Sequence, residues 1–462
     1  MTNKIFSLAL LLGATLLFTD CKREEDDLFS KSAAERLNDV KDVYSERLTA
    51  NEAGWALQYY PQIDEEAYSV AQRGYLMLAK FRADQTVDMA MNYWPEDQGD
   101  DKVAYRTTML TDNNSLWEVI SDNGPVLTFN SYNKVIHHFS NPEMYGSNDG
   151  YKGDYEFVII DAPEDGSHIL LKGKKRGTYN MMTPLPAGTD FQTYLDDVLA
   201  FQNKMFPAGL PYEPLIQIGG QNYAFRDAVT RFPVIYPEGK DPVVDGKHMP
   251  FVVTKQGDRY YLRFRDAVSF DDGANKAQNF YYDPAADEFI DAENSANKIV
   301  AGLEPNVMFD SSLKKGYRFV SYRNSSLGSM SDKMRQAFDA ASDAMTSVSK
   351  SYRIDSLFMA KTSEENKLVW SFKYQNNGRV MNYIYNYTVQ DNAITLTFEQ
   401  PDGTVPSNIY NHAKTGDLRT LLKDVFGQKF LVDKDETLFN MTRLKLTAES
   451  DKDLWFVVYI KN

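Results

Sequence analysis

Short runs of tyrosine, phenylalanine and β-branched residues recur along almost the whole chain, and turns containing glycine, asparagine or aspartate separate them. Such runs favour strands, because aromatic and β-branched side chains pack well on a pleated surface. The apolar run at 75–81, for example, is followed after a short polar stretch by another at 86–91. Sequential short strands with tight turns predict a mainly β (α+β) fold, built of antiparallel meander barrels or sandwiches.

A few peripheral amphipathic helices are expected to interrupt these strands. Apolar residues recur at helical spacing near the start of the fold, within a proline-rich stretch in the middle of the chain, and at 331–350. The proline-rich helix marks a boundary between two β-rich bodies. We therefore predict an N-terminal β-rich domain at 32–185, a helical junction at 186–214, and a C-terminal β-rich domain at 215–462 that includes the helix at 331–350.

The N-terminal segment carries the signals of an exported lipoprotein. Lys4 precedes a mostly apolar run at 5–18, which is shorter than the roughly 20 residues that span a bilayer. Cys21 follows this run and is the only cysteine in the chain. We predict that residues 1–20 are a lipoprotein signal peptide, that Cys21 carries the lipid, and that residues 21–31 form an acidic tether.

The acidic residues of this tether bear on where the protein resides. The stretch from Glu24 to Asp27 resembles the export signal of Bacteroidota lipoproteins, so we expect a lipid-anchored protein of the outer membrane that faces the cell exterior. Removal of residues 1–20 takes away Lys4 and Asp20, and the formal net charge therefore stays at −15. Such a chain repels nucleic acid and anionic headgroups. We therefore expect the N-terminal lipid to hold the protein to the membrane, and we expect no nucleic acid as a partner.

The histidines and serines show no catalytic signature. The chain has five histidines, none of them in a His-Glu-x-x-His pattern, and no serine stands in a Gly-x-Ser-x-Gly elbow. His137 and His138 are adjacent on a predicted strand, so their side chains would point to opposite faces and would not chelate one metal together. Once Cys21 is lipidated, no thiol remains for a nucleophile or a zinc site. We expect no cofactor and no metal, and we favour a protein without catalysis.

Acidic residues are abundant, and two clusters offer the oxygen ligands that calcium prefers. They are Asp97, Asp100 and Asp101, and Asp283, Asp287, Glu288 and Asp291. Neither cluster follows a calcium-loop spacing, so we interpret both as solvated loops. A glycoside hydrolase needs two carboxylates at a set distance across a cleft, and this alternative stays open because a sequence does not reveal that distance.

Three tyrosines form the most suggestive candidate for ligand binding. Tyr383, Tyr385 and Tyr387 alternate, so all three lie on one face of a predicted strand. The tyrosine pairs at 260–261 and 281–282 are candidates for their neighbours. Such a face can stack on sugar rings and donate hydrogen bonds, or it can form one wall of an aromatic core.

Several phrases of the sequence together carry a family resemblance. They are Cys21-Lys22 with its acidic tail, Ala-Glu-Arg-Leu at 34–37, Gly54-Trp55, the stretch from Asp122 to Asn133, Asp154-Tyr155-Glu156-Phe157, and Leu171-Lys172-Gly173-Lys174-Lys175. The chain resembles the Bacteroidota lipoproteins gathered as domain-of-unknown-function family 4302, most strongly over residues 21–185. The resemblance implies no catalytic residue. It implies an accessory lipoprotein of a nutrient-uptake locus, with a TonB-dependent transporter complex as a partner.

We therefore expect a non-catalytic surface lipoprotein that binds a small molecule, a glycan or a partner of the uptake machinery. Two alternatives remain at this point. One is a surface glycoside hydrolase that uses paired carboxylates, and the other is a binder of haem or another iron ligand, which His137 facing a pocket would support.

Overall fold

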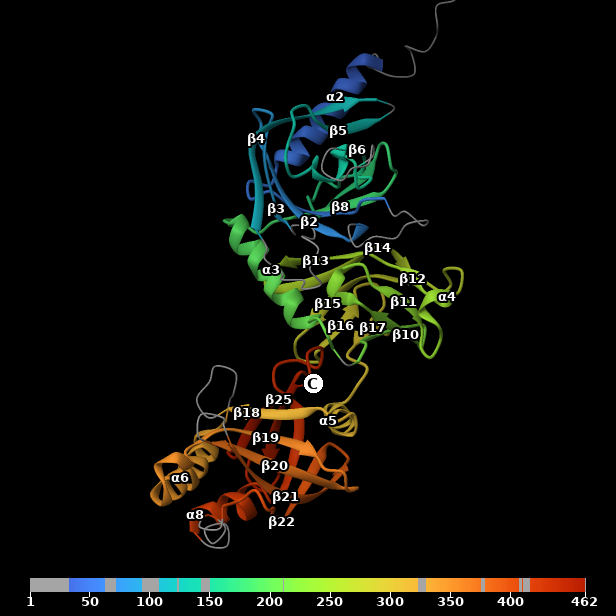
Figure 1. Ribbon diagram of the computed structural model, residues 1–462. Helices are drawn as coiled ribbons and strands as arrows, with labels where there is room; N and C mark the ends of the chain where they lie inside the picture. Colours follow the sequence, from blue (N-terminus) through green and yellow to red (C-terminus); the bar gives the residue numbers. More distant parts are fainter. Residues whose placement is uncertain are drawn as a thin grey trace, which may run out of the picture. The chain divides into compact units, whose positions relative to one another are not determined.

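The strands of this chain form three separate sheets (Figure 1). The computed structural model describes residues 33–62, 72–93, 108–122, 124–142, 150–210, 212–322, 330–374, 379–406, 409 and 416–461. Within them are a closed eight-stranded barrel, a nine-stranded sheet and a second closed eight-stranded barrel. The prediction of a mainly β fold with meander barrels and few helices is confirmed.

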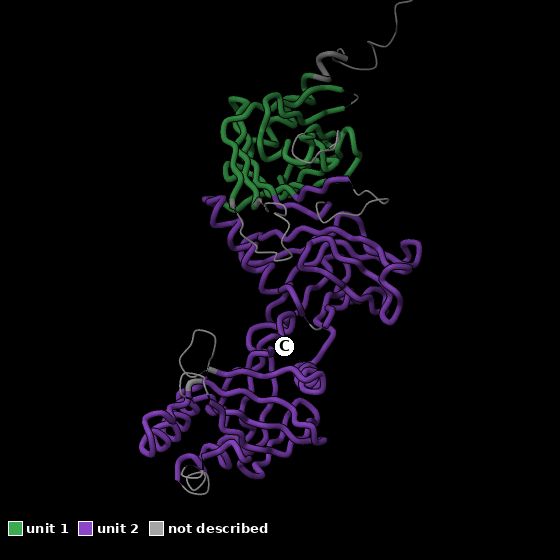
Figure 2. Tube along the Cα trace, in the orientation of Figure 1, with its two compact units in different colours: residues 1–57, 77–187 green, residues 58–76, 188–462 purple. Residues whose placement is uncertain are grey.

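Contacts divide the chain into two compact units, which Figure 2 colours separately. Unit 1 comprises residues 1–57 and 77–187, and unit 2 comprises residues 58–76 and 188–462. No helix within the described residues is long and apolar enough to cross a membrane.

The first barrel is a meander in which each strand neighbours the next one in sequence. Its strands are β1 (Trp55–Tyr59), β2 (Tyr75–Phe81), β3 (Thr86–Tyr93), β4 (Thr108–Ser121), β5 (Pro125–Phe129), β6 (Glu156–Asp161), β7 (Ile169–Gly173) and β8 (Tyr179–Pro184). Helix α2 (Ala33–Thr49) packs against β4 and β5. Among its side chains from residue 38 onward, Leu48 in the last turn is 1% exposed, whereas Val40 and Val43 remain exposed.

A buried aspartate links two of the phrases that carry the family resemblance. Asp154 lies directly over Gly173, where a Cβ atom would come within 2.0 Å of the Asp154 Oδ2 atom. The same carboxylate accepts hydrogen bonds from the main-chain N–H groups of Lys175 (3.0 Å) and Arg176 (3.0 Å). Gly173 is therefore required by the close approach of this side chain, which holds the turn after β7.

The nine-stranded sheet is antiparallel and has the order β12-β11-β10-β9-β17-β16-β15-β14-β13. Its strands are β9 (Leu215–Ile218), β10 (Gln221–Arg226), β11 (Val234–Pro237), β12 (Lys247–His248), β13 (Phe251–Gln256), β14 (Arg259–Val268), β15 (Ala277–Asp283), β16 (Glu288–Asp291) and β17 (Lys298–Val300). The short helices η4 (Ala228–Thr230) and α4 (Pro242–Asp245) lie in its connections.

Helix α3 (Phe191–Met205) packs against β13 of this sheet. Asp190 caps the helix by accepting a hydrogen bond of 2.9 Å from the Thr193 N–H group. The Tyr194 hydroxyl donates to the Lys255 carbonyl oxygen (2.8 Å) and accepts from the Lys255 N–H group (2.9 Å). The predicted junction helix is thus a packed element of the sheet.

The second barrel repeats the sequential order of the first. Its strands are β18 (Arg318–Tyr322), β19 (Ile354–Lys361), β20 (Lys367–Tyr374), β21 (Arg379–Gln390), β22 (Ala393–Pro401), β23 (Lys429–Lys434), β24 (Arg443–Ala448) and β25 (Trp455–Lys461). The residues that we predicted as one C-terminal body therefore carry two separate sheets.

Helices accompany the second barrel at several points. They are α5 (Pro305–Lys314), α6 (Asp332–Val348), the 3-10 turn η5 (Lys350–Tyr352), α8 (Gly416–Arg419) and the π-helical turn η7 (Thr420–Val425). The helix predicted at 331–350 is α6, and Ser331 caps it by accepting a hydrogen bond of 3.2 Å from the Met334 N–H group. Helices α8 and η7 pack against α6, and their buried leucines join the core of the barrel.

Candidate functional site

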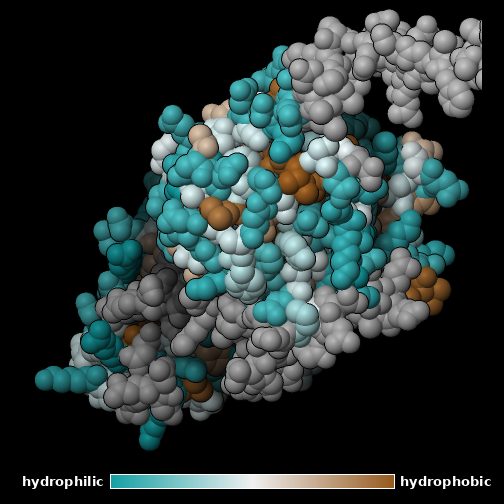
Figure 3. Space-filling view, turned by 90° about the horizontal axis from the view of Figure 1, so that it is seen from above, coloured by the Kyte–Doolittle hydropathy of each residue, from teal (hydrophilic) through white to brown (hydrophobic). Residues whose placement is uncertain are grey.

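Cys21 and the acidic tether, together with the cluster of Asp97, Asp100 and Asp101, lie outside the described residues. The remaining candidates are placed by the structure. The face of the molecule seen in Figure 3 is mainly hydrophilic, and its hydrophobic residues form small, separate spots. A binding site on this face would therefore depend on a hollow or on a cluster of specific side chains.

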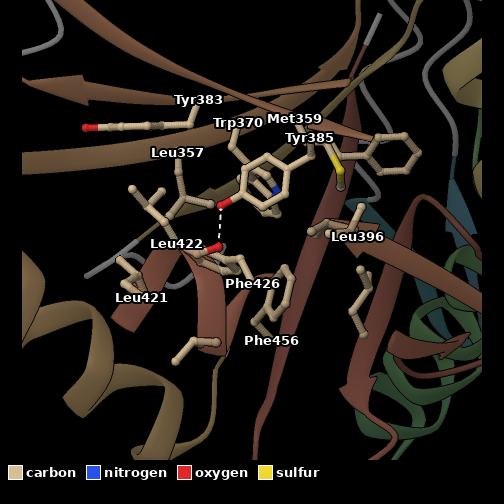
Figure 4. Packing of buried hydrophobic residues seen from close by; sticks show 14 of the residues in the cluster. Leu357, Met359, Trp370, Tyr383, Tyr385, Leu396, Leu421, Leu422, Phe426 and Phe456 are labelled. Atoms are coloured by element: carbon tan, nitrogen blue, oxygen red, sulfur yellow. Dashed lines mark hydrogen bonds between the residues drawn. The ribbon is translucent and has the colours of Figure 1, made fainter. Parts of the chain in front are cut away.

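The three alternating tyrosines point into the second barrel from β21. Tyr383 and Tyr385 are 0% exposed and Tyr387 is 6% exposed. The Tyr385 hydroxyl donates a hydrogen bond of 2.8 Å to the Leu422 carbonyl oxygen, close to Trp370 and Phe426 (Figure 4). Burial raises the pKa of Tyr385 well above its ordinary value. These rings are a wall of the core, and they present no open surface to a ligand.

The other tyrosine pairs are not neighbours of this face. Tyr261 of β14 lies directly opposite Tyr281 of β15 in the nine-stranded sheet. The same register places Tyr260 beside Tyr282 on the other face of these two strands. The expectation that these pairs adjoin Tyr383 and its neighbours is therefore wrong.

The adjacent histidines are not on a strand, because residues 134–137 form a turn and His138 begins the 3-10 helix η2 (His138–Ser140). His138 is buried, and burial lowers its pKa to about 4. His137 lies between two tyrosine rings, with centroid distances of 4.6 Å to Tyr155 and 5.1 Å to Tyr132. The pair does not present two imidazoles to one metal.

The interpretation of the second acidic cluster as a solvated loop is wrong for Asp287. Asp287 is 1% exposed, and its carboxylate accepts hydrogen bonds from Tyr282 (2.7 Å), Thr437 Oγ1 (2.7 Å) and the Leu438 N–H group (2.7 Å). It also forms an ion pair with Lys434. No group of three or more His, Cys, Asp or Glu residues with metal-binding geometry occurs in the part of the chain that the structure describes.

The strongest candidate for a site is a hollow of about 430 Å³ formed by α3 and the strands β14 and β15. This volume falls in the range of small-molecule sites, about 300–1,000 Å³. Its lining residues are Asp197, Ala200, Phe201, Lys204, Met205, Asp258, Tyr260, Tyr282 and Pro284. We call it the α3 hollow.

Three aromatic rings form the wall of the α3 hollow. The Phe201 ring stacks on the Tyr260 ring with centroids 3.8 Å apart and planes within 1° of parallel. The Tyr282 ring meets Phe201 edge to face at 5.3 Å. Tyr260 and Tyr282 are half-buried, and the Tyr282 hydroxyl is already bonded to Asp287, so the wall combines ring surfaces with the Tyr260 hydroxyl, as in sites for ring-shaped ligands with polar substituents.

Charged groups of both signs surround these rings. The Lys255 ammonium lies 5.5 Å from the centre of the Tyr260 ring and 2.8 Å from the Asp197 Oδ2 atom. The hydrogen bond to Asp197 raises the pKa of Lys255, which therefore stays charged. Burial, followed by the hydrogen bond to Asp287, raises the pKa of Tyr282, which stays neutral.

The carboxylates of the α3 hollow are poorly suited to hydrolysis. Asp197 and Asp258 are the two acids of its described lining, and Asp197 is 46% exposed and paired with Lys255. Asp258 is exposed on the turn between β13 and β14. A glycosidase acid needs an apolar surrounding, whereas both of these carboxylates are in contact with solvent. The geometry of the hollow therefore favours binding over bond cleavage.

The residues of the α3 hollow carry only a partial signal in the sequence, and the sequence-based prediction missed the site. Tyr260 and Tyr282 each belong to a Tyr-Tyr pair on neighbouring strands, and Phe201 lies on the apolar side of the junction helix. The face that each tyrosine occupies depends on the strand register, and that register is set by the fold.

Two comparisons with known proteins bear on this chain. A family model described as "Domain of unknown function (DUF4302)" matches residues 25–284, which is more than half of the chain. The matched range includes the first barrel and most of the nine-stranded sheet, so it contains the α3 hollow. No curated protein matches the chain.

Proposed function

The chain belongs to the DUF4302 family, and we propose that it is a non-catalytic, lipid-anchored protein of the outer-membrane surface that binds a small ligand for a nutrient-uptake system. The α3 hollow is the binding site in this proposal, and a saccharide is the favoured ligand class. A TonB-dependent transporter complex is the proposed partner, to which the ligand would pass.

One observation carries the binding role: the aromatic wall made by Phe201, Tyr260 and Tyr282 in a hollow of about 430 Å³. Sugar rings offer an apolar C–H face and a rim of hydroxyls, and aromatic rings bordered by polar groups match both features. The formal net charge of −15 adds a preference for neutral or cationic ligands over anionic ones.

The role of the α3 hollow can be tested with matched tyrosine variants. We expect Tyr260→Ala to weaken the binding of an oligosaccharide, first identified by a glycan-array screen, by about tenfold, because it removes a stacking ring. Tyr281→Ala is the control, since its side chain lies on the opposite face of the same pair of strands. Isothermal titration measures both affinities. If no glycan binds, or if both variants lose affinity equally, the assignment of this hollow is wrong.

The anchor can be tested separately at Cys21. We expect Cys21→Ala to move the protein from the detergent phase to the aqueous phase in a Triton X-114 partition, because several acyl chains hold a mature lipoprotein to its membrane and the acidic chain offers no basic patch instead. Cys21→Ser removes the same thiol with little change in size and should behave identically. A variant that remains in the detergent phase would rule out lipidation at this residue.

A further inference from the structure

The first barrel carries a second aromatic cluster that the α3 hollow does not include. His137 is flanked by Tyr155, with ring planes at 24°, and by Tyr132, with ring planes at 36°. Tyr132 is 57% exposed and Tyr155 is 41% exposed. We call these three residues the aromatic column. The two tyrosines therefore present aromatic surface to the solvent on either side of His137.

The turn of the aromatic column that carries His137 is held in place by a fully buried asparagine. Asn133 is 0% exposed, and its side-chain oxygen accepts hydrogen bonds from the N–H groups of Val135 (2.9 Å) and Ile136 (3.1 Å). Its amide nitrogen donates to Ser115 Oγ at 2.7 Å, which ties the turn to β4. The His137 N–H group closes this turn by donating to the Asn133 carbonyl oxygen at 3.0 Å. The main-chain position of His137 is thus fixed before any ligand arrives, which lowers the entropic cost of binding.

Each ring of the column has a polar edge. The main chain of Asn133 engages the His137 Nδ1 atom at 3.1 Å, so a ligand would meet Nε2. Burial lowers the pKa of His137, which keeps its imidazole neutral at pH 7. The Tyr132 and Tyr155 hydroxyls add donors and acceptors at the ends of the column.

We propose that Tyr132, His137 and Tyr155 form a surface subsite that binds a neutral sugar ring, which stacks on an exposed tyrosine face and hydrogen-bonds the ring edges. A neutral ligand fits an uncharged column on a protein with a formal net charge of −15, whereas phosphate or carboxylate ligands are repelled. A protein partner would need a much larger area than three rings, about 800 Å² on each side. The subsite lies in unit 1 and does not depend on the α3 hollow.

The test uses the full-length protein in detergent with maltohexaose, cellohexaose, xylohexaose and chitohexaose as probes. Binding is measured by saturation-transfer NMR and isothermal titration in a Tyr260→Ala background, which lowers the contribution of the α3 hollow, and the loss caused by each further substitution is taken relative to that background. We expect one of the four probes to bind and Tyr132→Ala to weaken it by about tenfold, with Tyr132→Phe retaining most of the affinity because the stacking ring remains.

Tyr179→Ala is the matched control, because Tyr179 is similarly exposed (45%) in the same barrel, and we expect unchanged affinity. Melting temperatures of all variants are measured alongside, to separate lost contact from lost folding. Failure of all four probes to bind at concentrations up to about 10 mM (a free energy near −2.7 kcal/mol) would overturn the proposal. An equal loss in Tyr132→Ala and Tyr179→Ala would overturn it as well.

Discussion

Asp287→Ala should lower the free energy of unfolding of unit 2 by about 3 kcal/mol, which is the lower end of the range for breaking a buried ion pair. The carboxylate is 1% exposed and lies on the turn between β15 and β16. Its removal leaves Thr437 and the Leu438 N–H group without their acceptor. The lower end of this range applies because the Lys434 side chain is 30% exposed, so its ammonium group is solvated by water once the carboxylate is removed.

Asp287 lies where the second barrel and the nine-stranded sheet are in contact, so its loss should affect how the two unfold together. Its partner Lys434 is the last residue of β23, and its partners Thr437 and Leu438 lie in the connection from β23 to β24 of the second barrel. The Asp287 carboxylate therefore joins that barrel to the nine-stranded sheet. Tyr212 supports the same connection by donating to the Leu438 carbonyl oxygen at 2.8 Å. We expect Asp287→Ala to make the unfolding of unit 2 less cooperative, visible in urea denaturation as a lower m-value.

The pH dependence of stability gives an independent measurement of this contact. Burial alone would raise the pKa of Asp287, but the hydrogen bonds from Lys434, Tyr282, Leu438 and Thr437 outweigh it and hold the pKa below its ordinary value. A depressed pKa contributes stability above the unfolded value of about 3.9, and that contribution is lost as pH falls through the folded value. Asp287→Asn should therefore flatten the acid limb of the stability curve below about pH 4.

Asp453→Ala is a suitable control, because it removes an exposed carboxylate in the same unit. We expect its free energy of unfolding to change by less than about 0.5 kcal/mol. If Asp287→Ala and Asp453→Ala behave alike in urea, then Asp287 does not connect the two sheets.

The sequence predicted the kinds of element better than their assembly. Alternation of buried and half-buried residues, as in Ile169–Gly173, is a local signal, and so are the caps at Asp190 and Ser331. The division of residues 215–462 into two sheets is not local. A turn between strands of one sheet contains the same residue types as a connection between sheets, so the pattern gives no indication of where one sheet ends.

The residues whose surroundings were predicted wrongly show which interactions a sequence pattern does not reveal. The stretch around His137 has the residue types of a strand, but the Asn133 side chain bonds the next N–H groups and forms a turn instead. The sequence pattern predicts a solvated carboxylate at Asp287, and its burial depends on Lys434 and Thr437, which are 147 and 150 residues away along the chain. Side-chain partners at such separations are set by the tertiary fold.

The alternating tyrosines illustrate how far a sequence alone can predict a candidate binding site. The period of two correctly places Tyr383, Tyr385 and Tyr387 on one face, because that follows from strand geometry. Whether this face meets water or core depends on which way the barrel closes. In a chain with 29 tyrosines, residue type does not separate the two possibilities.

Tyr385→Ala should destabilise unit 2 by about 3–5 kcal/mol, the usual cost of truncating a buried aromatic side chain. The ring packs edge to face on Phe398 at 5.4 Å and is fully enclosed, so its loss leaves a cavity in the second barrel. Tyr385→Phe keeps the ring and removes only the hydrogen bond to the Leu422 carbonyl oxygen. We expect it to cost about 1 kcal/mol.

The stability losses of Tyr385→Ala and Tyr385→Phe, compared with their effects on affinity, separate a core role for this tyrosine from a binding role. A core tyrosine predicts a large loss in urea denaturation for Tyr385→Ala, a small one for Tyr385→Phe, and unchanged affinity of the Phe variant for any oligosaccharide bound by the parent protein. A ligand-binding tyrosine predicts the reverse: near-normal stability in both variants, with affinity lost in Tyr385→Ala. Observing that second pattern would mean that the barrel opens to admit a ligand, because the closed barrel leaves no exposed face on this ring.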